Sequence, residues 1–143
     1  MNAGLHTLPS MAKQQFKSND NVVFSCQYHV VFCPKYRRKV LNDPIAARLK
    51  EIVFALAVEH GQEVIELEVM PDHVHLLCAV SPQFGVARWV RLVKGRTSRF
   101  LRMEFPELKR RLPTLWTHNY FISTVGGAPL SVIKQYIENQ KGK

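Results

Sequence analysis

The sequence predicts an α+β fold in which helices pack on an antiparallel sheet, as in ferredoxin-like and RRM-like domains. Three strand-like runs, at 22–33, 63–70 and 73–80, alternate with segments whose apolar residues recur at helical spacing. The second and third runs are joined by only two residues. So short a connection requires an antiparallel hairpin, because a parallel crossover needs a dozen or more residues. The predicted order is strand, helix, strand, strand, helix, strand, helix.

The chain of 143 residues has the size of one domain. Residues 1–21 are polar and have no hydrophobic face, so we expect a flexible N-terminal arm there. Residues 22–143 form the single predicted domain. No apolar run is long enough to span a bilayer and no signal sequence is evident, so we expect no membrane association and a cytoplasmic location.

The three cysteines favour free thiols. They are odd in number, form no CxxC pair and lie among apolar residues, at Cys26, Cys33 and Cys78. This arrangement suits neither a disulfide framework nor a structural zinc site of cysteines.

The first half of the domain contains a strand and a helix. In the first run, Cys26, Tyr28, Val30 and Phe32 alternate with other residues until Pro34 ends the strand. The pair Asp43-Pro44 then predicts an N-cap and a first helical residue. The helix that follows has five apolar positions and is closed by a glycine; these residues are Ile45, Leu49, Ile52, Val53, Leu56 and Gly61.

The hairpin follows, with strands Glu63–Met70 and His73–Val80 joined by Pro71-Asp72. We expect Ile65, Leu67 and Val69 to share one face of the first of these strands.

The second half continues with a helix over about 86–103, whose other positions are mostly cationic. Residues 106–113 are predicted to be a charged connector, and 115–124 one or two short strands. Gly126-Gly127 precedes a last helix over 129–140.

The charge of the chain favours a polyanionic partner. Lys and Arg number 20 against 11 Asp and Glu, which gives a net charge of +9. Such a field attracts nucleic acid, although a solvated basic surface would also explain it.

His73 and His75 are the first candidate functional residues. They lie two apart in a strand, so both imidazoles must project from one face of the sheet. Two imidazoles on a buried strand can bind a divalent metal if oxygen ligands complete the site. The alternative is a pair of incidental histidines, which is the commoner explanation of an isolated His-x-His.

Tyr136 and Gln140 are the second pair. They lie at i and i+4 of the last helix, beside Leu130, Ile133 and Ile137, which we expect to face the sheet. The amide oxygen of Gln140 could be a third metal ligand, and the hydroxyl of Tyr136 could attack a phosphodiester. Without the histidines, Tyr136 would be read as an ordinary amphipathic position.

Five segments together resemble the HUH-type single-tyrosine transposases of small bacterial insertion sequences, the TnpA family. The likeness covers nearly all of 22–141 and is carried by Tyr28-His29-Val30-Val31-Phe32 with Lys35-Tyr36-Arg37-Arg38, Met70-Pro71-Asp72-His73-Val74-His75-Leu76-Leu77, Leu115-Trp116, Tyr120-Phe121 with Ser123-Thr124-Val125-Gly126, and Tyr136-Ile137-Glu138-Asn139-Gln140.

This resemblance implies a function and a site. His73 and His75 would be the HUH ligands of Mg²⁺ or Mn²⁺, Gln140 the third ligand, and Tyr136 the nucleophile that forms a 5′-phosphotyrosine in single-stranded DNA. The family likeness further implies an RRM-like HUH nuclease fold, recognition of DNA hairpins, and a homodimer in which the tyrosine helix docks on the partner subunit.

Eight further residues are candidates for DNA contact, because cations neutralise phosphates and aromatic rings stack on bases. They are Lys35, Tyr36, Arg37, Arg38, Arg91, Lys94, Arg96 and Arg99. Two alternatives stay open at this point: a related HUH nickase or repeat-associated transposase, and a catalytically silent nucleic-acid-binding module.

Overall fold

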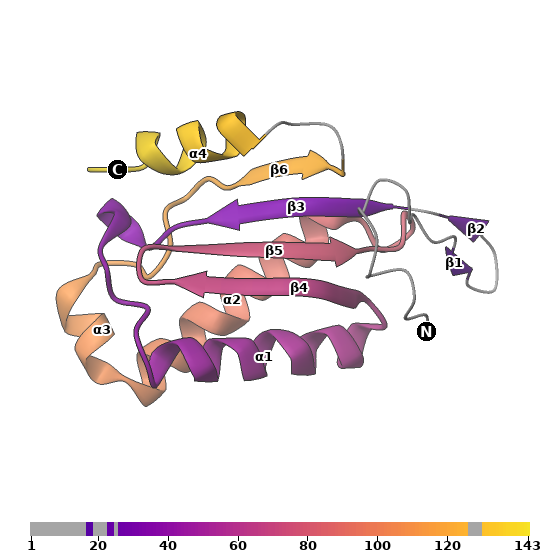
Figure 1. The fold of residues 1–143 in the computed structure, drawn as a ribbon. Coiled ribbons are helices and arrows are strands. Elements are labelled where there is room, and N and C mark those ends of the chain that lie inside the picture. The colour runs from indigo at the N-terminus through magenta and orange to yellow at the C-terminus, as the bar shows by residue number, and fades with distance from the viewer. Residues whose placement is uncertain (1–16, 19–22, 25, 126–129) are drawn as a thin grey trace.

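The computed structural model describes residues 17–18, 23–24, 26–125 and 130–143. Its central element is a four-stranded antiparallel sheet with the strand order β4-β5-β3-β6 (Figure 1). The strands are β3 (Gln27–Phe32), β4 (Glu63–Met70), β5 (His73–Ala79) and β6 (Phe121–Thr124). The predicted α+β class and the hairpin of β4 with β5 are confirmed.

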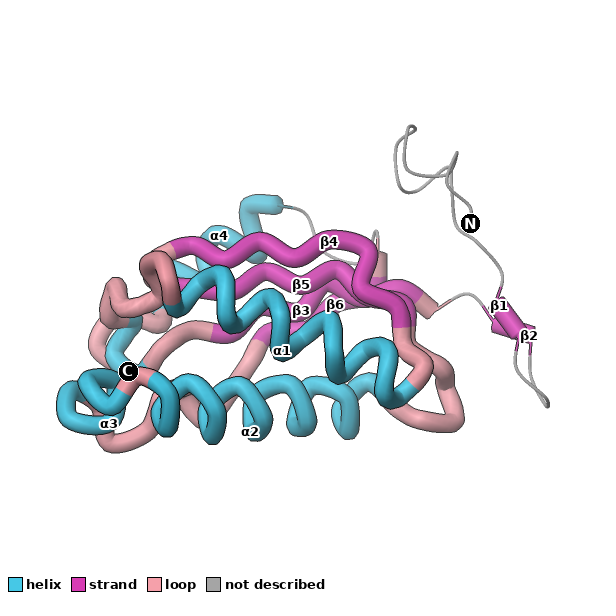
Figure 2. The backbone as a smooth tube through the Cα atoms, turned by 90° about the horizontal axis from the view of Figure 1, so that it is seen from below, coloured by secondary structure: helices cyan, strands magenta, loops and turns pink. Residues whose placement is uncertain are grey.

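Helices cover both faces of this sheet (Figures 1 and 2). Two long helices, α1 (Ile45–His60) and α2 (Val86–Glu104), lie side by side on one face, and α4 (Leu130–Asn139) lies on the other, next to β6. A short helix, α3 (Pro106–Arg111), follows α2, and a 3-10 turn, η3 (Lys35–Arg37), follows β3. Among the described residues, no helix combines the length and apolar character needed to cross a bilayer.

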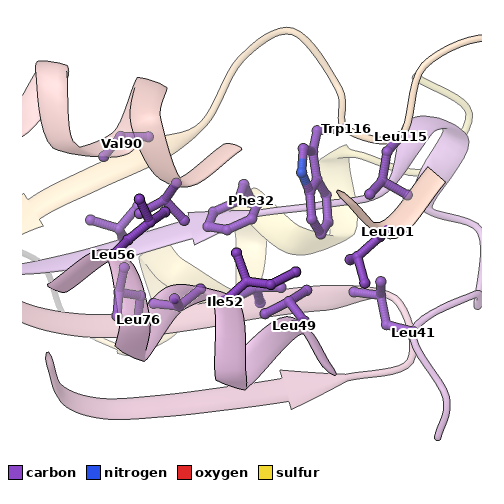
Figure 3. Packing of buried hydrophobic residues seen from close by; sticks show 14 of the residues in the cluster. Phe32, Leu41, Leu49, Ile52, Leu56, Leu76, Val90, Leu101, Leu115 and Trp116 are labelled. Atoms are coloured by element: carbon purple, nitrogen blue, oxygen red, sulfur yellow. The ribbon is translucent and has the colours of Figure 1, made fainter. Parts of the chain in front are cut away.

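The hydrophobic core fills the space between the sheet and the α1–α2 layer (Figure 3). Val74, Leu76 and Cys78 of β5 are fully buried there, against residues such as Leu49 and Trp89 of the two helices. Each such aliphatic or aromatic side chain contributes roughly 1.5–3 kcal/mol by leaving water. Since side chains alternate along a strand, His73 and His75 project from the opposite face, toward the α4 side.

The ends of α1 correct one prediction and confirm another. Pro44, and not Asp43, occupies the N-cap position, and no side chain caps the helix. The carbonyl of Asn42 instead accepts the N–H of Ala46, so the backbone supplies the partner that a cap would have supplied. At the other end, Gly61 closes the helix with φ 68°, which glycine adopts without steric cost.

The predicted connector after α2 is wrong, because residues 106–111 form α3. Its charges suit the helix dipole: Glu107 lies in the first turn, and Lys109, Arg110 and Arg111 lie in the last. Leu108 is buried in the core and fixes the helix to it.

A bulge in β4 changes which side chains of that strand share the core face. The pairing with β5 shifts register between Val64 and Glu66, so Val64 packs on the core together with Leu67 and Val69. Ile65, which strict alternation would have placed there, is the extra residue of the bulge.

The remaining differences lie at the two ends of the domain. In segment 115–124 only Phe121–Thr124 is a strand, while Trp116 makes an isolated bridge to Pro34. β1 (Lys17–Ser18), which lies in the predicted arm, pairs with β2 (Val23–Phe24), which lies at the start of the predicted first strand. The rest of residues 1–21, the Gly126-Gly127 break and the helix start at Pro129 lie outside the described residues.

Candidate active site

One row of side chains runs across the sheet on its α4 face. His75 of β5 pairs with Glu68 of β4 and with Val31 of β3, and Val31 pairs with Phe121 of β6. Residues directly opposite one another in antiparallel strands have side chains on the same face. Because neighbouring strands lie roughly 4.8 Å apart, His75 and Phe121 are separated by about 10 Å.

Tyr136 lies at the end of this row. Its ring packs on Phe121 with 5.5 Å between ring centroids, and its hydroxyl donates to the side-chain oxygen of Asn119 at 3.0 Å. The tyrosine helix therefore lies over the face of the sheet that carries the two histidines. Burial raises the pKa of Tyr136 well above its ordinary value, so the resting phenol is protonated.

The loop that holds Asn119 is organised by Lys94 of α2. Its ammonium group donates to the carbonyls of Thr117, His118 and Asn119 at 2.8, 3.3 and 3.0 Å. Burial lowers the pKa of Lys94 to about 8.

His73 is oriented by the residue before it. Its Nδ1 lies 2.9 Å from a carboxylate oxygen of Asp72, in the β4–β5 turn. A histidine held in this way through Nδ1 presents Nε2 to its other side, which is the usual arrangement around metal-binding histidines.

His75 is stacked on a third histidine. The His75 and His29 rings have centroids 5.2 Å apart, and His75 Nε2 lies 3.0 Å from His29 Nδ1. Burial is the main cause that lowers the pKa of both, so both imidazoles are neutral over a wider range of pH. A neutral imidazole has the lone pair that a metal requires.

Gln140 follows α4 and carries a buried amide oxygen whose hydrogen-bonding capacity is not used by the residues that the structure describes. Its side chain is 2% exposed, its Nε2 donates to the carbonyl of Tyr136 at 3.3 Å, and its Oε1 has no hydrogen-bond partner among the described residues. A buried amide oxygen without a partner is costly unless something else binds it.

The chemistry of these donors is compatible with a divalent metal. Within the described part of the chain, no three His, Cys, Asp or Glu side chains form a metal site. A site built on His73 and His75 thus needs a donor of another type, and the amide oxygen of Gln140 is such a donor. Mixed imidazole and oxygen ligation suits Mn²⁺, and Mg²⁺ with additional oxygen ligands.

The apolar stripe of α4 is shorter than predicted. Ile133 is buried and Ile137 is half-buried, but Leu130 is 63% exposed. Contact with the sheet therefore begins one turn into the helix.

The eight candidates for DNA contact lie on two sides of the molecule. Lys35, Tyr36, Arg37 and Arg38 follow β3 and lie beside the end of α4, where Tyr36 N–H donates to the Lys143 carbonyl. The other four, Arg91, Lys94, Arg96 and Arg99, belong to α2 on the opposite face of the sheet (Figure 2).

These residues also differ in whether their side chains are exposed or bound to partners within the protein. Arg38, Arg91 and Arg99 are exposed, and Tyr36 is 39% exposed with Lys35 and Arg38 near its ring. Arg96 lies 3.7 Å from Glu59. Arg37 and Lys94 are engaged within the protein, so a phosphate would compete with those internal partners.

Three residues of the site were not predicted from the sequence: His29, Asp72 and Asn119. Asp72 had a local signal, since it immediately precedes the first histidine in the hairpin turn. His29 shares a strand face with Val31, and its place beside His75 can be predicted only when the register of β3 against β5 is known. Asn119 has no sequence signal, because a loop residue reaches the tyrosine only in the folded chain.

Comparisons with known proteins identify the family of the chain. Residues 22–140 match the family model described as "Transposase IS200 like". The chain belongs to this family. Its members are transposases, enzymes that cut DNA and transfer strands, so the predicted family and the general class of activity are confirmed.

Relatives in two bacteria show the same family over most of their length. The chain is 39% identical to the ISDra2 transposase TnpA of Deinococcus radiodurans, over 90% of this chain and 94% of that protein. It is 31% identical to the transposase for insertion sequence element IS200 of Salmonella typhimurium, over 87% and 82% of the two chains.

Solved structures share the fold. A crystal structure of a transposase from Deinococcus radiodurans R1 matches with a TM-score of 0.80 at 38% identity, covering 89% of this chain and 99% of that one. A REP-associated tyrosine transposase bound to a REP hairpin matches with a TM-score of 0.52 at 13% identity, covering 85% and 68%. This second likeness shows the fold alone.

Proposed function

We propose that this protein is the transposase of a small insertion sequence, which cleaves and rejoins single-stranded DNA through a 5′-phosphotyrosine on Tyr136. One observation carries the proposal beyond family membership. The tyrosine helix lies over the sheet face that holds His73 and His75, and it buries the partnerless amide oxygen of Gln140 one turn from Tyr136.

The proposed reaction is a pair of transesterifications. The phenolic oxygen of Tyr136 attacks the scissile phosphorus and loses its proton, the bond from phosphorus to the 3′ oxygen breaks, and that oxygen leaves as a 3′-hydroxyl. A second 3′-hydroxyl then attacks the phosphotyrosine, which restores the phosphodiester and the phenol. Because the bond energy stays in the covalent link, the reaction needs no nucleotide cofactor.

His73, His75 and Gln140 would hold the divalent ion, Mg²⁺ or Mn²⁺. When bound, the ion supplies Lewis-acid stabilisation of the charge that develops on the phosphate. The protein's own residues orient the reactants: Asp72 orients His73, His29 orients His75, and Asn119 holds the hydroxyl of Tyr136 at the edge of the site.

The substrate we propose is single-stranded DNA that carries hairpins. The net charge of +9 attracts phosphate, and exposed Arg38 and Tyr36 offer a cation and a ring beside the end of α4. A protein of the same fold has been captured on a REP hairpin. We further propose a homodimer in which the tyrosine helix is exchanged between subunits.

Covalent capture tests the proposal directly. The protein is incubated with Mn²⁺ and labelled single-stranded DNA that contains the ends of its own element, and denaturing gel electrophoresis then detects the adduct. Wild-type protein should form it and Tyr136→Phe should not, because that substitution removes one oxygen and keeps the ring.

The control is Tyr36→Phe, which removes a hydroxyl from the exposed tyrosine and should leave adduct formation in place. An adduct that persists in Tyr136→Phe would refute the assigned nucleophile. A wild-type protein that binds the hairpins but never forms an adduct would instead be a silent binding module.

A further inference from the structure

Arg37 connects two parts of the candidate site that are far apart in the sequence. Its Nε lies 3.3 Å from a carboxylate oxygen of Asp72. One terminal nitrogen donates to the carbonyl of Ile137 and to the carboxylate of Glu138, both at 3.2 Å. The Arg37 side chain is only 12% exposed, so it fills the junction between the β4–β5 turn and the last turns of α4.

Asp72 extends this connection to a proposed metal ligand. One of its carboxylate oxygens pairs with Arg37, and the other lies 2.9 Å from Nδ1 of His73. A single carboxylate thus joins the guanidinium group to the imidazole. Partners of this kind set the ring orientation and the basicity of metal-binding histidines.

The backbone at this point is held in an uncommon conformation. Tyr36 and Arg37 have φ angles of 62° and 52°, although neither is glycine. Such positions persist only where the surrounding contacts enforce them, and they cluster at functional sites. The enforcing contacts include the bond from Tyr36 N–H to the Lys143 carbonyl, which fixes the same end of the chain that Arg37 holds.

We propose that Arg37 is a positioning residue that couples metal binding at His73 to the seating of the tyrosine helix. When α4 is seated, Glu138 and the Ile137 carbonyl hold the guanidinium against Asp72, and Asp72 in turn holds His73 in its ligating orientation. By thermodynamic reciprocity, metal binding at His73 must then favour the seated helix to the same degree. This inference rests on the proposed metal site.

The geometry requires an arginine in particular. A guanidinium group is a planar fork that can contact a carboxylate along one edge and a carbonyl and a second carboxylate from another nitrogen. A lysine ammonium keeps the charge but cannot reproduce the span. Arg37→Lys therefore separates this role from a phosphate contact, which lysine would preserve.

The test measures Mn²⁺ affinity by electron paramagnetic resonance in the absence of DNA, together with amide hydrogen exchange across residues 133–140 with and without Mn²⁺. In the wild type, Mn²⁺ should increase protection of these amides. Arg37→Lys, Arg37→Gln and Asp72→Asn should each weaken Mn²⁺ binding about tenfold or more, the usual effect of losing such a partner. They should also remove the Mn²⁺-dependent gain in protection.

Two further variants serve as a partial disruption and as a control. Glu138→Gln removes only the outer contact of Arg37, so it should reduce the gain in protection less than Arg37→Gln does. Arg48→Gln is the matched control, because Arg48 is likewise an arginine bridging two carboxylates, Glu51 and Glu104, but it lies on α1 away from this site. It should behave as the wild type, and circular dichroism confirms that each variant is folded.

The outcomes separate the two proposals. A wild type that binds no Mn²⁺ overturns both the metal site and the coupling. Mn²⁺ binding that is lost in His73→Ala but unchanged in Arg37→Lys and Arg37→Gln overturns the coupling alone. The coupling also fails if the α4 amides respond to Mn²⁺ equally in the wild type and in Arg37→Gln.

Discussion

At the scale of single residues, the site combines groups that are half-buried and each held by a neighbour. His73 is held by Asp72, His75 by His29, and Tyr136 by Asn119. None of these pairs is a strong stabiliser of the fold, since a typical net hydrogen bond contributes about 1 kcal/mol. Their value is geometric, because catalytic groups must be placed closely to act together.

The first residue-scale prediction concerns the histidines. His73→Ala or His75→Ala should lower cleavage of single-stranded DNA by about a hundredfold or more, the scale seen when one group that stabilises transition-state charge is lost. Hairpin binding should persist, because neither substitution removes a cation from the surface. Gel-based cleavage and binding assays measure the two effects, and normal cleavage by either variant would refute the metal ligands.

The second concerns thiol reactivity. Burial raises the pKa of both Cys33 and Cys78 to about 12, and both side chains are fully buried. The thiolate is the reactive form, so these two cysteines should resist a disulfide reagent such as DTNB at about pH 8. Native protein should release at most one equivalent of thionitrobenzoate, from Cys26, and denatured protein three. Rapid release of three equivalents without denaturant would contradict the described burial.

At the scale of elements, the helices are joined to the sheet by a few buried polar contacts as well as by apolar packing. Thr97 of α2 accepts the indole N–H of Trp116 at 3.0 Å and itself donates to the carbonyl of Val93 at 2.7 Å. Trp116 in turn packs edge-on against Phe32 of β3. This contact ties α2 to the segment that leads into β6.

Thr97→Val should test that connection. The substitution keeps the shape but leaves the buried Trp116 N–H without its partner, which costs about 1–3 kcal/mol. Urea denaturation should show a lower midpoint with an unchanged slope. Thr124→Val is the control, because Thr124 is an exposed residue of β6 and its substitution should change the free energy of unfolding little. A Thr97→Val protein as stable as the wild type would show that the indole bond contributes nothing net.

At the scale of the whole molecule, the two faces of the sheet have separate roles. One face buries the core under α1 and α2, and the other carries the histidines of β5 on the side where α4 lies (Figure 1). On the candidate-site face the described helix is α4, which lies next to β6 and packs Tyr136 on Phe121. A helix with few contacts is the element best suited to move or to exchange between subunits.

The exchanged dimer leads to a complementation prediction. A mixture of Tyr136→Phe and His73→Ala proteins should regain part of the wild-type cleavage, because some heterodimers would combine one intact tyrosine with one intact histidine pair. Each variant alone should be inactive. If subunits demonstrably exchange and the mixture stays inactive, the active site is built within one chain.

The charge of the molecule predicts strong salt dependence. Single strands lose affinity with a slope of about 0.7 per contacted phosphate, so about four contacts would give a loss of about 50-fold between about 50 and about 200 mM salt. Fluorescence anisotropy with labelled DNA measures this slope.

The fully paired form of the same sequence should be cleaved very little, since nothing in the proposed site opens a duplex. Equal cleavage of both forms would contradict the proposed substrate.

The sequence alone determined the features that depend on local pattern. Apolar periodicity predicted β3, β4, β5, α1 and α2, and the two-residue spacing of His73 and His75 placed both on one face, because alternation is a property of any extended strand. The four-residue spacing of Tyr136 and Gln140 predicted that the two side chains lie close together in the last helical segment, although α4 ends at Asn139 and Gln140 follows it. The resemblance of the motifs to a known family then predicted the function of these residues.

Only the tertiary structure decided how these elements meet. The bulge in β4, the pairing that aligns His75 with Phe121, and the approach of Asn119 and His29 to the site all depend on contacts between segments that are distant in the sequence. Arg37 is the clearest case: as a sequence it is one cation in a basic run, but folding places it between Asp72 and Glu138. Local pattern sets which face a side chain occupies, whereas its partner is set by contacts between segments that the chain brings together only on folding.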